Sequence, residues 1–158
     1  PDAQAVRLGW LRVGSPTQAA VRAAADAPLV RWQDGLALVS VGLPDGPLRG
    51  GDLLPVEVDW RADRTPERDL TFFVHLLDAA GEIVAQTDRR PFEGRFPTPA
   101  WLPGEALADT YTVPLPPELP AGDYRLRVGF YDDAGRLPVA DGTADFAVLD
   151  EVARVASR

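Results

Sequence analysis

The sequence predicts an all-β protein: an immunoglobulin-like antiparallel β-sandwich of about 7–9 strands, preceded by a less regular N-terminal segment. Three observations lead to this prediction. The 158 residues include 16 prolines and 14 glycines, which divide the chain into short apolar segments. Several of these segments alternate apolar and polar residues with a period of two, which is typical of half-buried strands. The strand signals recur every roughly 8–15 residues, which is the spacing of a sandwich.

Four segments show the alternation clearly: residues 54–60, 109–115, 124–133 and 144–149. Each is expected to form a strand with one buried and one solvated face. Pro114 indicates that the second of these strands lies at a sheet edge or ends there, because proline cannot donate to a neighbouring strand. The residues expected to face inward are Leu54, Val56, Val58 and Trp60; Tyr111, Val113 and Leu115; Tyr124, Leu126, Val128 and Phe130; and Ala144, Phe146 and Val148.

Two further segments, residues 36–43 and 70–77, are apolar on both faces, and this pattern predicts central strands that are covered above and below. The second is followed by "DAAG" at residues 78–81. Aspartate at the first position and glycine at the last suit a tight hairpin turn, so residues 82–87 should return antiparallel. The "DDAG" at residues 132–135 repeats this turn pattern.

The chain is expected to divide into three parts: an irregular N-terminal segment that packs on the sandwich (1–34), the β-sandwich domain (35–150) and a C-terminal tail (151–158). Within the first part, "VRLGWLRV" is a possible strand, and the alanine-rich stretch after it is a short helix or a covering loop. The last residues are expected to form a frayed tail or a helical turn.

Composition excludes several function classes. The formal net charge is −8, whereas nucleic-acid binding requires a basic patch, so no nucleic-acid partner is expected. No apolar run approaches the ~20 residues that span a bilayer, so this segment is not expected to insert into a membrane. The chain has no cysteine, which excludes disulfides and thiolate chemistry.

Catalytic motifs are also missing. A nucleophilic triad or a zinc site would need more histidine or cysteine than the single histidine of this chain, and no glycine-rich phosphate loop occurs. Two carboxylates would suffice for glycoside hydrolysis, and turn carboxylates for calcium, but the aspartates at turns are explained by backbone capping. We therefore expect no catalytic residues, no metal and no cofactor.

The single histidine, His75, occupies a strand that should be buried. It shares a face with Phe73 and Leu77, and this face needs a cover. The proline-rich and aromatic-rich connection at residues 88–106 is the expected cover. Asp88, at its start, is the expected hydrogen-bond partner of the imidazole, because a buried polar group needs one.

Two interpretations of this region are open. In the first, His75 is a satisfied core residue that pins the connection. In the second, His75, Asp88 and Trp101 belong to a shallow sugar-binding surface, with Trp101 as the stacking platform. Exposed Tyr131 and Trp32 would favour the second interpretation, since pyranose rings stack on aromatic faces.

Three motifs carry a resemblance to a known family: "FVHLLD" followed by Asp88, a P-T-x-x-W-x-P-G-E loop at residues 97–105, and a G-x-Y-x-L-x-V-G-x-Y-D strand at residues 122–132. Over roughly Leu36 to Val148 the chain resembles the C-terminal extracytoplasmic β-sandwich module of bacterial protein-mannosyltransferase-like (family-39-type) membrane glycosyltransferases. The turn "DDAGRLPV" is shorter than the family's pattern.

The resemblance implies a non-catalytic accessory domain on the extracytoplasmic face of a bacterial membrane, cut from a longer polypeptide. Its partner would be the membrane-embedded portion of the same polypeptide, where the family's catalytic acids lie, and a glycan or lipid-linked sugar is a further candidate partner. The alternative is a structural or adhesion module of a cell-surface protein without sugar binding. A small glycosidase is the third hypothesis.

Overall fold

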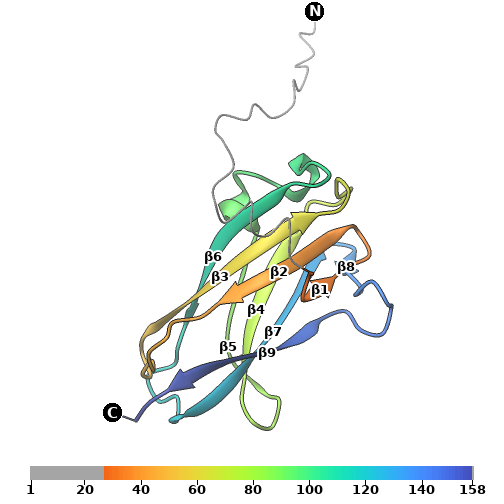
Figure 1. Ribbon diagram of the computed structural model, residues 1–158. Coiled ribbons are helices and arrows are strands. Elements are labelled where there is room, and N and C mark those ends of the chain that lie inside the picture. The colour runs from red at the N-terminus through yellow and green to blue at the C-terminus, as the bar shows by residue number, and fades with distance from the viewer. Residues whose placement is uncertain (1–26, 158) are drawn as a thin grey trace, which may run out of the picture.

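The structure, a computed structural model, describes residues 27–157, in which two antiparallel β-sheets pack face to face (Figure 1). The predicted all-β sandwich is confirmed. Most of the N-terminal segment predicted at residues 1–34, including its possible strand and helix, lies outside the described residues. The last part of that segment is described, and it contains a short strand whose Val30 is buried in the core.

The first sheet has the strand order β1-β2-β3-β6. β3 pairs with the whole of β6, from Leu53 opposite Pro114 to Arg61 opposite Ala106. β6 is the edge strand and ends at Pro114, as the proline predicted. The strands of this sheet are β1 (Val30–Arg31), β2 (Leu36–Gly42), β3 (Leu53–Ala62) and β6 (Ala106–Pro114).

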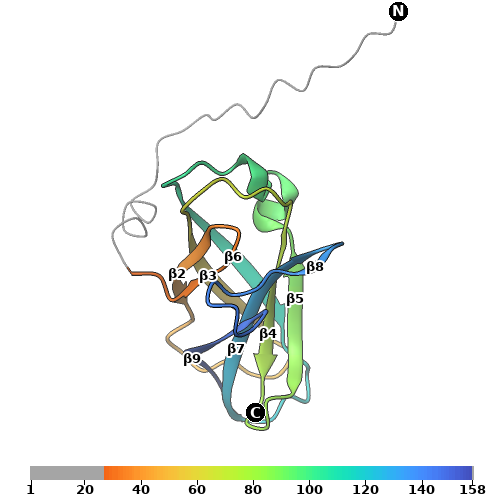
Figure 2. The same ribbon diagram turned by 90° about the vertical axis from the view of Figure 1, so that its right-hand side faces the viewer.

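The second sheet has the order β5-β4-β7, with β8 and β9 both paired to the far side of β7 (Figure 2). β4 is therefore central, which explains why both of its faces are apolar. The predicted hairpin after β4 is confirmed, since the Asp78 carboxylate accepts hydrogen bonds of 2.9 Å from the backbone N–H groups of Ala80 and Glu82. The strands are β4 (Thr71–Leu77), β5 (Ile83–Arg89), β7 (Gly122–Asp132), β8 (Gly135–Arg136) and β9 (Ala147–Val155).

An aromatic cluster fills the space between the sheets. The Trp60 ring lies 4.4 Å from Phe72 and 5.2 Å from Phe130, centroid to centroid. These edge-on and tilted contacts are the arrangements that aromatic quadrupoles favour. The inward residues predicted for the first three alternating segments are all buried, so the parity of β3, β6 and β7 is confirmed.

The C-terminal strand differs from the prediction. β9 runs to Val155, so the expected tail from residue 151 is mostly strand. The parity predicted for residues 144–149 is wrong, because the strand begins at Ala147 and Val148 is 42% exposed. Phe146 precedes the strand and lies over Arg127, outside the core. The inward residues of β9 are Leu149, Ala153 and Val155.

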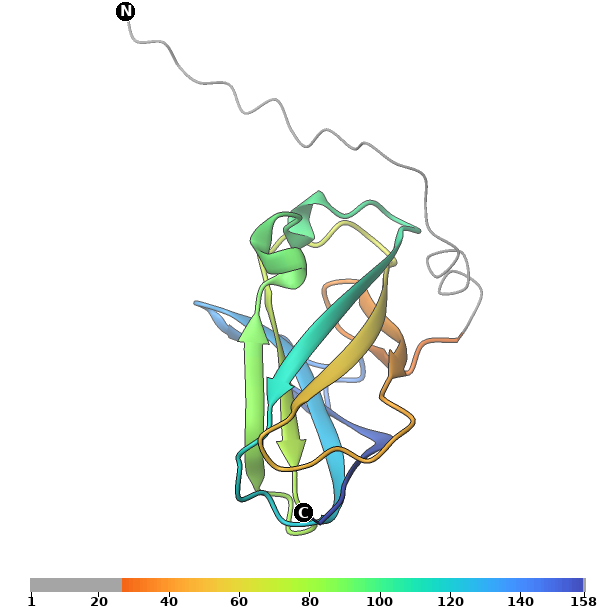
Figure 3. The same ribbon diagram turned by 90° about the vertical axis from the view of Figure 1, so that its left-hand side faces the viewer.

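The connection from β5 to β6 crosses from the second sheet to the first (Figure 3). It contains two short 3-10 turns, η1 (Pro91–Gly94) and η2 (Thr98–Ala100), and it covers one end of the sandwich. Trp101 follows η2 and enters the core, where its ring lies 6.4 Å from that of Trp60. Its indole N–H donates to the Phe96 carbonyl at 3.1 Å, so the buried nitrogen has a partner.

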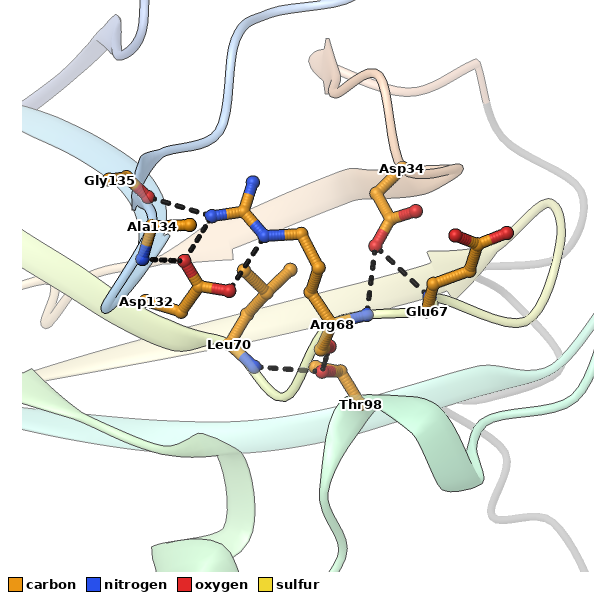
Figure 4. Close-up of polar contacts among 8 residues, drawn as sticks. All are labelled: Asp34, Glu67, Arg68, Leu70, Thr98, Asp132, Ala134 and Gly135. Carbon is orange, nitrogen blue, oxygen red and sulfur yellow. Dashed lines mark hydrogen bonds and ion pairs between the residues drawn. The ribbon is translucent and has the colours of Figure 1, made fainter.

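A polar clamp around Arg68 fastens the same end (Figure 4). The Arg68 guanidinium donates to both carboxylate oxygens of Asp132 and, at 2.9 Å, to the Gly135 carbonyl. This hydrogen bonding lowers the pKa of Asp132 below its ordinary value. The buried Thr98 hydroxyl accepts from the Leu70 N–H at 3.0 Å and donates to the Arg68 carbonyl at 2.6 Å. The clamp joins the β3–β4 connection, η2 and the β7–β8 hairpin.

Candidate functional site

The candidate site lies on the outer face of the second sheet, away from the core. We call it the His75 cluster. It lies across β5, β4 and β7, which are neighbours in Figure 2. In the strand register, Asp88 of β5 lies opposite Phe73, and Arg127 of β7 lies opposite His75. Tyr131 is opposite Arg136 of β8. The cluster consists of Phe73, His75, Asp88, Arg127, Tyr131 and Arg136.

His75 is held between an arginine and a carboxylate. An amino group of Arg127 lies 3.1 Å from Nδ1 of the imidazole, and Nε2 lies 3.5 Å from an Asp88 carboxylate oxygen. Because a guanidinium can only donate, Nδ1 must be the acceptor, so the proton of the neutral ring is on Nε2, facing Asp88. Burial lowers the pKa of His75. The positive charges of Arg127 and Arg136 lower it further, whereas the negative charge of Asp88 raises it. The ring is therefore neutral near pH 7.

Phe73 forms the floor of the cluster and is almost completely buried. Its ring lies 4.6 Å from that of His75 and 6.3 Å from that of Tyr131, and the Arg136 guanidinium lies 5.0 Å above it. The neighbouring position in β7 is Gly129, where a β-carbon would lie 2.5 Å from the Phe73 ring. Glycine at this position therefore makes room for the ring.

Arg127 is fixed by two contacts. Its guanidinium lies 5.0 Å from the ring of Phe146, in addition to its hydrogen bond to His75. A guanidinium that already packs over an aromatic ring loses less conformational freedom when it binds an anion. Its buried Nε has no hydrogen-bond partner among the described residues.

Tyr131 and Asp88 form the accessible rim. The Tyr131 hydroxyl donates to Asp88 at 3.2 Å, and the pKa of Tyr131 is raised by burial and by that carboxylate. The Asp88 side chain is 31% exposed. The pairing expected between His75 and Asp88 is therefore present, and Tyr131 joins it.

Trp101, the fourth predicted site residue, lies elsewhere. It is fully buried in the core, on the opposite side of the sheet from His75, so its predicted role as a stacking platform is wrong. The expectation that the 88–106 connection covers His75 is also wrong. β5 and β6 belong to different sheets, so the connection must pass over the end of the sandwich instead of lying on an outer face.

The other aromatic residues considered for stacking differ in exposure. Trp32 is 2% exposed and packs against Phe130 at 5.2 Å, so it offers no face to a ligand. Tyr131 and Phe146 are partly exposed. Arg127, Arg136 and Phe146 were not predicted as site residues. The available signal was the alternation of β7, which correctly placed Arg125 and Arg127 on its outer face.

A groove of about 600 Å³ lies beside β1 and the residues that lead into β9. Its lining includes apolar Leu29 and Val139 and acidic Asp141, Asp150 and Glu151. Arg31 also lines the groove, and its guanidinium forms an ion pair with Asp63. The groove therefore offers carboxylates and apolar surface, whereas the His75 cluster offers donors and acceptors that are fixed by packing.

Within residues 27–157, no three histidine, aspartate or glutamate side chains are placed to hold a metal ion. The same residues contain no helix that is both long and apolar enough to cross a membrane.

Comparison with solved structures finds chains of similar fold. The crystal structure of the C-terminal domain of Wzt matches with a TM-score of 0.54 and 15% sequence identity, over 84% of this chain and 83% of that one. The likeness is one of fold. No protein-family model matches the chain, and no curated protein does. The resemblance to family-39-type glycosyltransferases gains no support from these comparisons.

Proposed function

We propose that this chain is a non-catalytic accessory β-sandwich domain that binds glycan on the outer face of its second sheet. The row Asp88–His75–Arg127, set across three adjacent strands, is the observation that carries the proposal. Each of these side chains is held by another member of the row. A site built on central strands keeps its geometry better than one built on loops.

The chemistry of the cluster suits a sugar. A sugar hydroxyl both donates and accepts hydrogen bonds, and the cluster offers a carboxylate acceptor at Asp88, a phenol at Tyr131 and guanidinium donors at Arg127 and Arg136. Exposed Gln86 lies opposite His75 in the ladder and adds an amide. Tyr131 and Phe146 supply the aromatic surface that was expected from Trp101.

Binding is favoured over catalysis by the environment of His75. Both ring nitrogens face charged side chains, and its ring is 6% exposed, so it is poorly placed to exchange protons with a substrate. The nearby carboxylates are also engaged: Asp88 by Tyr131, and Asp145 by Arg136 at 3.5 Å. A glycosidase pair would instead need two carboxyl groups facing one cleft.

We also propose that the domain serves a longer, membrane-embedded glycosyltransferase-like polypeptide outside the membrane. The motifs shared with that family support this proposal, and the matched structure is itself the C-terminal domain of a protein. The full reading frame tests it: several upstream membrane-spanning segments would support the proposal, and a series of repeated sandwiches would favour an adhesion module.

Glycan binding is tested by titrating the chain with a panel of neutral and acidic oligosaccharides in a calorimeter. Tyr131→Ala should weaken binding roughly 10-fold or more, because it removes a hydrogen-bonding group and its ring. Thr112→Ala is the matched control, since Thr112 is exposed on β6 of the other sheet. The site would be rejected if no saccharide gave a heat of binding at millimolar concentration, or if both variants lost the same affinity.

A further inference from the structure

We propose that the glycan carries an acidic group, a carboxylate or a phosphate, which Arg125 and Arg127 bind. This inference rests on the proposed function and names the class of its ligand. The two residues are consecutive outward positions of β7, so their Cα atoms are separated by about 7 Å. One anionic group can therefore contact both long side chains.

The charge distribution supports an anionic ligand. The whole chain has a formal net charge of −8, yet this face presents Arg125, Arg127 and Arg136. Arg136 is paired with Asp145. In the described part of the chain, neither Arg125 nor Arg127 forms an ion pair, and the guanidinium of Arg127 has one hydrogen bond, to His75, and one cation–π contact, with Phe146. Because neither arginine is engaged in an ion pair, their positive charge is available to a ligand.

Arg127 is prepared for such a ligand. One of its amino groups donates to His75, its guanidinium carbon lies 5.0 Å from the centre of the Phe146 ring, and its remaining donors have no hydrogen-bond partner among the described residues. Guanidinium groups bind carboxylate and phosphate through paired, charge-assisted hydrogen bonds, which are roughly twice as strong as neutral ones. Arg125 is exposed beside it and supplies a second cation.

Two exposed valines of β9 lie next to the two arginines, with exposed Asp150 between them in the sequence. In the β7–β9 ladder, Arg127 lies opposite Val148 and Arg125 lies opposite Val152, and these valines are 42% and 39% exposed. A guanidinium beside an exposed valine, twice along the strand, matches a ligand in which an acidic group and a C–H face lie close together. A uronic acid residue or a sugar phosphate has this arrangement.

The experiment titrates the chain with four probes: an oligomer of glucuronic acid, a neutral glucose oligomer of equal length, a hexose phosphate and inorganic phosphate. We expect heat with the glucuronic acid oligomer or with the hexose phosphate, weaker binding at higher salt, and little heat with the neutral oligomer. Whichever acidic saccharide binds identifies the anion. Binding of inorganic phosphate as tight as that of the saccharides would show an anion site without sugar recognition and would overturn the inference.

Variants locate the site. Arg125→Gln, an exposed change that should leave folding intact, is expected to weaken acidic-saccharide binding roughly 10-fold to 100-fold, as expected for losing hydrogen bonds to a charged group. The control is Arg95→Gln, which removes the same charge from a side chain that is 77% exposed on the β5–β6 connection. Equal effects of the two changes would overturn the inference.

The two proposals fail differently. If neutral and acidic oligomers bind equally, the ligand class is wrong and glycan binding stands. If no saccharide binds, both are wrong.

Discussion

The two faces of β4 are both buried, but different groups bury them. Phe72, on the inner face, packs against Trp60, Phe130 and Tyr111, all of which are aromatic. Phe73, on the outer face, is covered by an arginine, a tyrosine and an imidazole. The comparison shows that an apolar strand predicts burial without revealing whether a rigid core or a set of polar side chains provides it.

The strongest test of this difference compares Phe72→Ala with Phe73→Ala. We expect Phe72→Ala to cost about 3–5 kcal/mol of unfolding free energy, because the surrounding rings cannot close the cavity. Phe73→Ala should cost clearly less, because the long Arg136 side chain can settle into the space. Urea denaturation of both variants measures the difference, and equal losses would show that the outer face is as rigid as the core.

Gly129→Ala probes the packing of the outer face from the backbone side. The added β-carbon would lie 2.5 Å from the Phe73 ring and 3.1 Å from the Asp145 carbonyl oxygen. We expect a loss of about 1–3 kcal/mol from overpacking. Adding Phe73→Leu to Gly129→Ala should recover part of that loss, because it removes the atoms that clash. A double variant no more stable than Gly129→Ala alone would point to the Asp145 carbonyl instead.

Thr98→Val tests whether the end of the sandwich depends on polar contacts as the outer face does. The change keeps the shape and removes both hydrogen bonds of the buried hydroxyl, which leaves the Leu70 N–H without its acceptor. The expected cost is about 1–3 kcal/mol. Thr112→Val on exposed β6 is the control, and thermal melts of the two variants should differ by several degrees.

The smallest expected effect is a pH dependence that belongs to the outer face alone. The folded-state pKa of His75 lies below its ordinary value of 6.5, so the unfolded chain binds more protons between the two values. Stability should therefore fall as the pH drops below 6.5 toward the folded-state pKa. His75 is the single histidine of the chain, so His75→Gln should flatten the melting temperature between pH 7 and 5, whereas Phe72→Leu should leave its slope unchanged.

The parts of the fold that could be predicted are those decided by neighbours in the sequence. The alternation of β3, β6 and β7 determined which side chains point inward, and the Asp78 and Asp132 turns followed from side-chain capping. The wrong assignments include the role of Trp101 and the parity of β9. Both depend on the path of the chain outside the strands. The position of Trp101 depends on the crossing to the other sheet after β5, and the parity of β9 depends on the strand starting three residues later than predicted. Periodicity within a strand carries no information about either.

The candidate site was predictable to the same extent. His75 and Asp88 were paired correctly because a buried imidazole needs a partner, and Asp88 is nearby in sequence. Arg136 and Phe146 come from segments about 60 or more residues away in the chain. Their place over Phe73 and Arg127 depends on how β8 and the start of β9 meet β7, which no local pattern specifies.

The fixed tautomer of His75 has a practical consequence. Because Arg127 keeps a donor against Nδ1, the ring nitrogens should give one protonated and one unprotonated signal in a nitrogen NMR spectrum, and no other histidine can obscure them. Any molecule that draws Arg127 away would change those two resonances at once. The two resonances would thus report on such a molecule without an attached probe or a substitution.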